Sequence, residues 1–129
     1  KEYAKGRVIA VFGCGGNRST TRRFEMGEVS GRYSDITVVT SDNPRDEAPE
    51  LIIKDILEGV RTTQGQYVVE EDRTLAIRAA IRMAGPDDVV LIAGKGHEDY
   101  QIFGDKRIHF DDVEVARAEL SALERDREK

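Results

Sequence analysis

Two short polar segments contain the residue types best suited to binding a small charged molecule. Residues 41–45 supply the side-chain amide of Asn43 and the guanidinium of Arg45. Residues 94–98 supply two glycines, an ammonium, an imidazole and the carboxylate of Glu98. An arginine can hold a carboxylate through two parallel hydrogen bonds, and a glutamate can accept a bond from an ammonium. Together the two segments suit a small ligand that has charges of both signs.

Each polar segment directly follows an apolar run that is typical of a buried parallel strand. These runs are residues 35–40 and residues 88–93. The carboxyl ends of parallel strands meet at one edge of an open α/β sheet, and ligands bind there. We therefore expect the two polar segments to converge on one site.

Strand-like and helix-like stretches alternate along the chain, which is the pattern of βαβ units. Strands are expected over residues 7–12, 35–40, 67–70 and 88–93, and helices over residues 24–33, 50–60, 72–84 and from 111 to about 123. Residues 100–103 and 106–110 flank a Gly-Asp pair and predict a hairpin. The chain is therefore expected to be an α/β domain.

Helical periodicity predicts which side chains face the core. The helix over residues 50–60 has one apolar face, made of Ile52, Ile53, Ile56, Leu57 and Val60. In the helix over residues 72–84, we expect Ile77, Ile81 and Ala84 to point inward. Asp111 and Glu114 have the spacing of a capping box for the last helix.

A glycine-rich turn, residues 13–16, follows the first strand. The dinucleotide-binding pattern G-x-G-x-x-G fails, because Arg18 stands where its third glycine should be. Such a turn still exposes backbone N–H groups that favour an anion, and Arg18, Arg22 and Arg23 strengthen that interpretation. A tight turn with solvated arginines is the alternative.

Composition excludes several classes of function. The 129 residues suffice for one domain, and a net charge of −5 argues against a general nucleic-acid surface. Cys14 is the single cysteine, which excludes an internal disulfide and a multi-thiolate metal site and fits a reducing compartment. His97 and His109 have no convenient carboxylate pair, so a zinc site is not expected. Without a signal peptide or a membrane-length apolar run, the protein is expected to be cytoplasmic.

The ends of the sequence suggest a piece of a larger protein. The first residue is Lys1 rather than methionine, so we expect residues 1–129 to be one domain cut from a longer protein, or a processed fragment. The charged residues 124–129 are expected to fray.

Five motifs, in chain order, are similar to those of one enzyme family. They are residues 11–18, 26–27, 42–45, 94–101 and 108–112. They closely resemble the C-terminal domain of MurE-type ligases, the UDP-N-acetylmuramoyl-tripeptide synthetases of peptidoglycan assembly. The resemblance extends from about Arg7 to Leu120. It implies a Rossmann-like three-layer α/β sandwich with a mostly parallel sheet and a C-terminal antiparallel hairpin.

The resemblance also implies an activity. Such ligases use ATP and Mg²⁺ to convert the carboxylate of UDP-MurNAc-dipeptide into an acyl phosphate, which the amine of a diamino acid attacks. The N-terminal and central domains of the family, which supply the P-loop and the magnesium ligands, have no counterpart here, since no G-K-[ST] triplet occurs. We therefore expect this chain to present the amino acid to a central ATPase domain and to be inactive alone.

Residues that hold meso-2,6-diaminopimelate in such ligases have matches in this chain. They are Arg18, Asn43, Arg45, Gly94 and Glu98, with Asp42 as support for its loop. Asn17 matches a nucleotide contact, and the resemblance places no catalytic residue and no metal ligand in this chain. L-Lysine lacks the distal carboxylate that Arg45 would hold, and relatives that use lysine usually lack this arginine. The expected amino acid is therefore meso-diaminopimelate.

The chain departs from the family pattern in the glycine-rich turn. The family usually has Gly-Gly-Asp-Arg-Asp followed by Gly-Lys-Arg-Pro, whereas this chain has Asn17, Ser19, Thr21, Arg22 and Phe24 at the differing positions. The departures concern ATP contact more than amino-acid contact. Two alternatives remain: a stand-alone anion- or nucleotide-binding module, and a Mur-like ligase domain for L-lysine or another amino acid.

Overall fold

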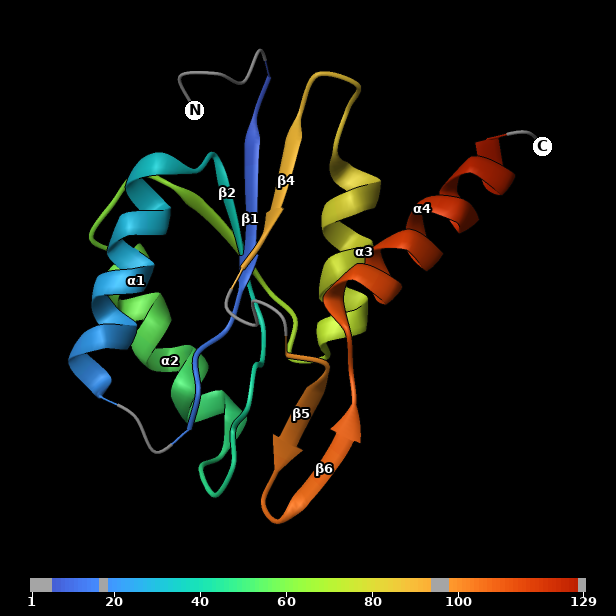
Figure 1. Ribbon diagram of the computed structural model, residues 1–129. Coiled ribbons are helices and arrows are strands. Elements are labelled where there is room, and N and C mark those ends of the chain that lie inside the picture. The colour runs from blue at the N-terminus through green and yellow to red at the C-terminus, as the bar shows by residue number, and fades with distance from the viewer. Residues whose placement is uncertain (1–5, 17–18, 94–97, 128–129) are drawn as a thin grey trace.

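A four-stranded parallel sheet forms the centre of the computed structural model, which describes residues 6–16, 19–93 and 98–127. The strands are β1 (Val8–Phe12), β2 (Ile36–Val39), β3 (Gln66–Val69) and β4 (Val89–Ile92). Their order is β3-β2-β1-β4, so the chain first extends the sheet on one side of β1 and then adds β4 on the other (Figure 1). The direction of winding therefore reverses beside β1, which is where ligands bind in open α/β sheets.

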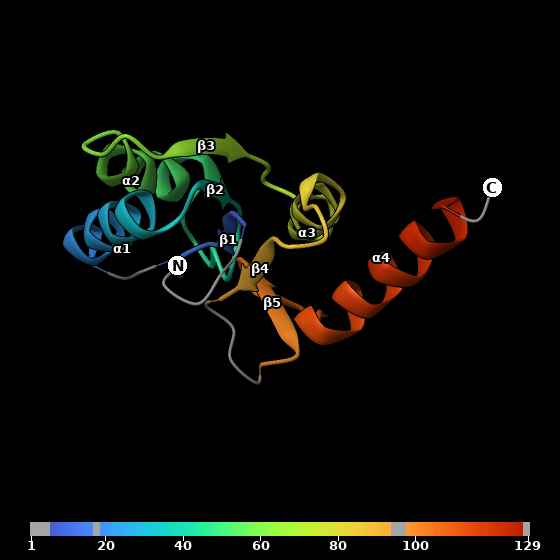
Figure 2. The same cartoon turned by 90° about the horizontal axis from the view of Figure 1, so that it is seen from above.

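Helices cover both faces of the sheet. Helices α1 (Thr20–Tyr33) and α2 (Pro49–Val60) lie on one face, and α3 (Arg73–Met83) and α4 (Asp112–Arg127) lie on the other, as the view along the strands shows (Figure 2). The predicted three-layer α/β sandwich with a parallel sheet is confirmed.

The core consists of two apolar clusters, one on each side of the sheet. All five residues of the predicted α2 face are buried, and they pack with Phe12, Cys14 and Val39. The second cluster joins the sheet to α3 and to Phe110, and Ile77 and Ile81 are buried in it as predicted. Its buried members are Ile9, Val11, Val38, Ala76, Ile77, Ala80, Ile81 and Phe110. Ala84 is only partly buried at its edge.

Two glycines allow α1 and α2 to pack closely. A methyl group on Gly27 would overlap the backbone carbonyl of Ile56, and one on Gly59 would overlap that of Phe24. Both obstacles are helix backbone, which cannot move aside as a flexible side chain could. Gly27 lies in one of the family motifs, and this packing gives a structural reason for the glycine there.

The predicted hairpin is present as a separate two-stranded antiparallel sheet. Strand β5 (Tyr100–Phe103) pairs with β6 (Lys106–His109), and Gly104 adopts a φ of 62° in the turn. The hairpin lies beyond the carboxyl end of the parallel sheet, next to the loop that follows β2 (Figure 1).

Two helix boundaries differ from the prediction by more than one residue. Helix α1 begins at Thr20 rather than Phe24, because the Ser19 hydroxyl accepts a hydrogen bond from the Arg22 N–H (3.4 Å) and caps the helix. Helix α4 continues to Arg127 rather than ending near Leu123, and an ion pair of 2.9 Å between Arg82 and Asp126 ties its last turns to α3.

The start of α4 bears out only part of the predicted capping box. The Asp111 carboxylate accepts from the backbone N–H groups of Val113 (2.8 Å) and Glu114 (3.3 Å), as a cap should. The Glu114 carboxylate lies 2.7 Å from the imidazole Nε2 of His109. This contact raises the pKa of His109 above its ordinary value, because the carboxylate favours the charged ring.

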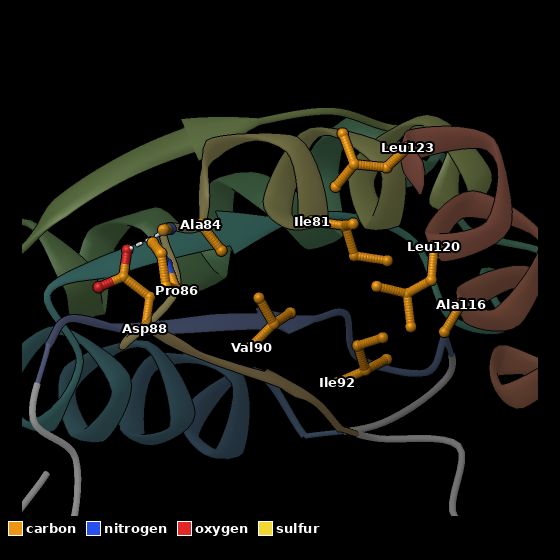
Figure 3. A pocket seen from close by; sticks show the side chains of 10 residues that line it. Ile81, Ala84, Pro86, Asp88, Val90, Ile92, Ala116, Leu120 and Leu123 are labelled. Carbon is orange, nitrogen blue, oxygen red and sulfur yellow. Dashed lines mark hydrogen bonds between the residues drawn. The ribbon is translucent and has the colours of Figure 1, made fainter. Parts of the chain in front are cut away.

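An apolar groove of about 340 Å³ lies between β4, α3 and α4 (Figure 3). Its floor includes Val90 and Ile92, and Leu120 and Leu123 of α4 line it from the other side. The acid at its edge, Asp88, accepts hydrogen bonds from the N–H of Gly85 and from the N–H and guanidinium of Arg7. These bonds lower the pKa of Asp88 to about 2 and account for the residue structurally.

Across residues 6–16, 19–93 and 98–127, no helix is both long and apolar enough to cross a membrane.

Candidate functional site

The loop after β2 is joined to the hairpin by backbone hydrogen bonds. The Arg45 N–H donates to the carbonyl of Ile102 (3.0 Å), and the Gly104 N–H donates to the carbonyl of Arg45 (2.6 Å). Arg45 itself has a φ of 55°, a left-handed conformation that side chains other than glycine rarely adopt. The bonds on both sides of Arg45 hold this unfavourable backbone in place, so the direction of its side chain is fixed by the hairpin.

Asn43 connects this loop to the start of the hairpin through its side chain. Its Oδ1 accepts from the backbone N–H of Ile102 (3.0 Å), and its Nδ2 donates to Oε1 of Glu98 (3.3 Å). Because a backbone N–H can only donate, the atom facing Ile102 must be the amide oxygen, which leaves the amide nitrogen facing Glu98. Asn43 is only 2% exposed. The structure therefore brings Glu98, the described residue of the second polar segment, to the first polar segment, as the sequence predicted.

Glu98 is held by neutral donors. Its second carboxylate oxygen accepts from the hydroxyl of Tyr100 (3.2 Å), so that both oxygens are engaged. No lysine, arginine or histidine among the described residues forms an ion pair with it. Its negative charge is oriented by the protein without being neutralised by these residues.

Arg45 places a positive charge on the loop after β2. Its Nη1 donates to the backbone carbonyls of Gly16 (3.2 Å) and Asn43 (3.4 Å). Three arginines of the described chain are not solvent-exposed: Arg23, Arg45 and Arg73. Carboxylates pair with Arg23 and Arg73, whereas none in the described part of the chain pairs with Arg45. Its charge is therefore available to an anion from outside these residues.

The glycine-rich turn packs directly on the same loop. The Gly16 N–H donates to the carbonyl of Asn43 (2.6 Å). A methyl group on Gly16 would overlap the Pro44 carbonyl, so a residue with a side chain would displace the loop. Asp42 is buried, and its carbonyl accepts from Nε2 of Gln101 (2.9 Å), a bond that anchors the loop from below.

Arg23 does not serve as the anion-binding residue that the sequence suggested. It is buried, and it pairs with Glu47 (2.8 Å) and Asp55 (2.9 Å) and donates to the Gly15 carbonyl (3.1 Å). Both carboxylates raise the pKa of Arg23 and neutralise its charge. Arg22 is exposed beside the turn, where a hollow of about 280 Å³ is also lined by Cys14. The alternative of solvated arginines therefore holds for Arg22 and fails for Arg23.

Cys14 is a buried core residue. It is 8% exposed, and its Sγ lies 3.5 Å from the sulfur of Met26. Burial raises the pKa of the thiol to about 11, and the nearby Arg23 offsets only part of that rise. The thiol is therefore a poor nucleophile in the folded chain.

Part of the predicted site lies outside the described residues. Asn17, Arg18 and Gly94 fall there, together with Lys95, Gly96 and His97. In the described ranges, no three His, Cys, Asp or Glu side chains are grouped so that they could hold a metal ion.

Sequence reasoning missed three residues that build the site: Arg73, Tyr100 and Gln101. Tyr100 and Gln101 lie in the motif at residues 94–101, which was the available signal for both. Arg73 gave no local signal, because its contacts at Ser41 and Ala93 are distant in sequence.

Comparison with known proteins identifies the family of the chain. A family model described as "Mur ligase, glutamate ligase domain" matches residues 1–96. Over 123 residues the chain is 57% identical to UDP-N-acetylmuramoyl-L-alanyl-D-glutamate--2,6-diaminopimelate ligase 1 of Clostridium acetobutylicum, a match that covers 95% of the chain and 25% of the relative. A ligase of Clostridioides difficile, named for the same reaction, is 54% identical over 123 residues with the same coverage.

A solved structure extends the similarity to the fold. The structure, titled as a UDP-N-acetylmuramoyl-L-alanyl-D-glutamate--2,6-diaminopimelate ligase, superimposes with a TM-score of 0.88 at 37% identity, over 94% of this chain and 25% of that one. The chain spans about a quarter of the length of these relatives. On the match to most of its length and on the motifs it contains, the chain belongs to the Mur ligase family, as a glutamate ligase domain.

Proposed function

We propose that this chain is the amino-acid-presenting domain of an ATP-dependent ligase of peptidoglycan synthesis. The ligase would join meso-2,6-diaminopimelate to UDP-MurNAc-L-alanyl-D-glutamate. The observation that carries the proposal is the pair Arg45 and Glu98, two opposite charges that no described residue neutralises and that are both bonded to Asn43. The names of the relatives support the same substrate.

The chemistry of the pair favours an amino acid over other ligands. One end of meso-diaminopimelate is a carboxylate with an ammonium on the adjacent carbon. Arg45 offers a planar guanidinium for the carboxylate, and Glu98 offers an acceptor for the ammonium. Arg18 and Gly94, which match the family's other contacts, remain proposed members of this site.

The same pair discriminates between diamino acids. The side chain of L-lysine ends in an ammonium without a carboxylate, so a lysine bound with its side chain at this site would leave Arg45 unpaired. A half-buried charge without a partner costs binding free energy, which makes lysine the poorer ligand. Arg45 is therefore proposed to select for the diacid.

In the proposed reaction this domain positions the nucleophile. The substrate carboxylate takes a phosphoryl group from ATP to give an acyl phosphate and ADP. The free amino group of diaminopimelate, deprotonated, then attacks the acyl carbon and expels phosphate, so one amide bond forms and one acyl–phosphate bond breaks. If Arg45 and Glu98 hold the far end of the amino acid, the reacting amine would point out of the domain.

ATP, Mg²⁺ and the UDP-sugar are assigned to the parts of the ligase outside this chain. Among the described residues, no three His, Cys, Asp or Glu side chains are grouped so that they could hold the Mg²⁺ ion, which we assign to the rest of the ligase. Asn17 is kept as a nucleotide contact in the full ligase, and the central ATPase domain is the proposed partner. The proposed compartment is the cytoplasm.

Amino-acid-dependent ADP release by the full-length ligase tests the proposal. We expect turnover with meso-diaminopimelate and little with L-lysine, and Glu98→Gln should raise the KM for the amino acid while leaving the KM for ATP unchanged. Equal turnover with lysine would contradict the assigned substrate. A Glu98→Gln effect on ATP alone would contradict the assigned site.

A further inference from the structure

Arg73 bonds to the backbone just after β2 and just after β4, although it forms no hydrogen bond with Arg45 or Glu98. It is the first residue of α3, and its side chain is fully buried. Its guanidinium meets the Asp112 carboxylate with two bonds, from Nε at 2.8 Å and from Nη2 at 2.7 Å. Such a forked pair fixes the plane of the guanidinium and leaves its outer N–H groups with defined directions.

Those outer N–H groups donate to backbone carbonyls just beyond the carboxyl ends of two strands. Nη1 donates to the Ser41 carbonyl (3.0 Å), and Nη2 donates to the Ala93 carbonyl (3.1 Å). Ser41 lies just beyond β2 and Ala93 just beyond β4, and these strands flank β1 in the sheet. One side chain thus bridges the two points at which the site's polar segments leave the sheet.

Helix stability does not explain an arginine at this position. The first turn of a helix favours negative charge, so a cation there is unfavourable for α3 itself. A buried ion pair also adds little net stability compared with apolar residues of similar size. The bonds to Ser41 and Ala93 are the feature that an apolar replacement could not supply.

We propose that Arg73 is a positioning residue that fixes the spacing between Ser41 and Ala93, the points at which the chain leaves β2 and β4, and thereby the position of Asn43. It acts on the substrate only through the loop after β2. Gln101 assists on the β2 side, where its Nε2 donates to the Asp42 carbonyl (2.9 Å). The consequence for diaminopimelate binding rests on the proposed function, whereas the consequence for loop geometry does not.

Amide NMR of the labelled chain tests the geometric part without a ligand. Arg73→Gln should shift the Asp42, Asn43 and Ile102 amides and speed hydrogen exchange at the Ile102 N–H by about tenfold or more, because the Asn43 acceptor moves. Arg73→Lys keeps the charge for Asp112 but lacks the fork, so it should show the same changes to a smaller extent. The Arg73→Lys variant also keeps the test open should Arg73→Gln unfold the chain.

Two controls separate positioning from general loss of stability. Arg78→Gln removes another bond between α3 and α4, the 2.9 Å contact of Arg78 with Glu119, without touching a site loop. Ile81→Val loosens the α3 core. If either control changes the same amides as much as Arg73→Lys does, the positioning role is overturned.

Kinetics of the full-length ligase test the functional part. Arg73→Lys should raise the KM for meso-diaminopimelate by about tenfold or more and leave the KM for ATP within about twofold. An unchanged KM for the amino acid would overturn this part. If the unaltered ligase does not use diaminopimelate, the proposed function fails, and the amide comparison still decides the role of Arg73.

Discussion

The side-chain amide of Asn43 donates to the carboxylate of Glu98 at 3.3 Å, across a separation of 55 residues in sequence. This bond joins the loop after β2 to the start of the hairpin. The same amide accepts from the Ile102 N–H, so Asn43 sets where Glu98 lies relative to β5. The position of the Glu98 charge relative to the loop after β2 therefore depends on one buried amide.

Replacing Asn43 should separate its two roles. Asn43→Ala removes the acceptor for the Ile102 N–H and should lower the free energy of unfolding by about 1–3 kcal/mol, measured by urea denaturation. Asn43→Asp keeps an acceptor but sets a carboxylate against Glu98, so its deficit should shrink as the pH falls and the carboxyl groups become protonated. A deficit for Asn43→Asp that does not change with pH would contradict the contact with Glu98.

Arg45→Gly should weaken diaminopimelate binding while leaving the free energy of unfolding almost unchanged. Glycine adopts a φ of 55° without strain, so the free energy of unfolding should change by no more than about 1 kcal/mol. Loss of the guanidinium should weaken diaminopimelate binding by about 1.5–3 kcal/mol, measured in the full-length ligase. Arg117→Ala, on the exposed side of α4, is the matched control and should bind normally. Normal binding by Arg45→Gly would show that the carboxylate is held elsewhere.

Gly27→Ala should destabilise the domain because the new methyl group meets the Ile56 carbonyl of α2. We expect a loss of about 1–3 kcal/mol in urea unfolding, typical of overpacking against a rigid neighbour. Gly85→Ala is the control, since a methyl group there makes only an ordinary contact with Asp88. It should be neutral or gain up to about 1 kcal/mol. Equal effects at the two positions would refute the close packing of α1 on α2.

Cys14 should be unreactive in the folded chain. With a pKa of about 11, only about one thiol in a thousand is ionised at pH 8, and burial blocks access to the sulfur. Iodoacetamide should label it slowly until denaturant is added. Complete labelling of the native chain within minutes would contradict the burial of this residue.

Asp88 should make stability depend on pH in acid. Its pKa falls from an ordinary 3.8 to about 2 on folding, so its stabilising effect is complete above pH 3.8 and is lost as the pH drops through about 2. Asp88→Asn should therefore be less stable than the parent chain at pH 5, with the difference closing toward pH 2. A difference that is the same at pH 5 and pH 2 would rule out this assignment.

The sequence predicted the elements well, and it predicted that Glu98 would lie beside the loop after β2, because both follow from local patterns. Apolar runs marked the strands, and the spacing of Ile52, Ile53, Ile56, Leu57 and Val60 marked the buried face of α2. Parallel strands then required their following loops to share an edge.

Long-range partners could not be predicted in the same way. Nothing near Arg23 or Arg73 in sequence shows that one pairs with Glu47 and Asp55 and the other with Asp112. The capping box at Asp111 failed in part for the same reason: Glu114 was expected to bond backwards, and His109 from the hairpin offered a competing partner. Family resemblance supplied Asn43 and Glu98 as site residues but not the hydrogen bond between them.

The most direct test of the central claim is an amide NMR titration of this chain with meso-diaminopimelate, with L-lysine and ATP as parallel ligands. We expect shifts at Asn43, Arg45 and Glu98 with meso-diaminopimelate and much smaller ones with lysine. Equal shifts with lysine, or shifts confined to residues 13–17 with ATP, would contradict this expectation and favour a different amino acid or a nucleotide-binding module.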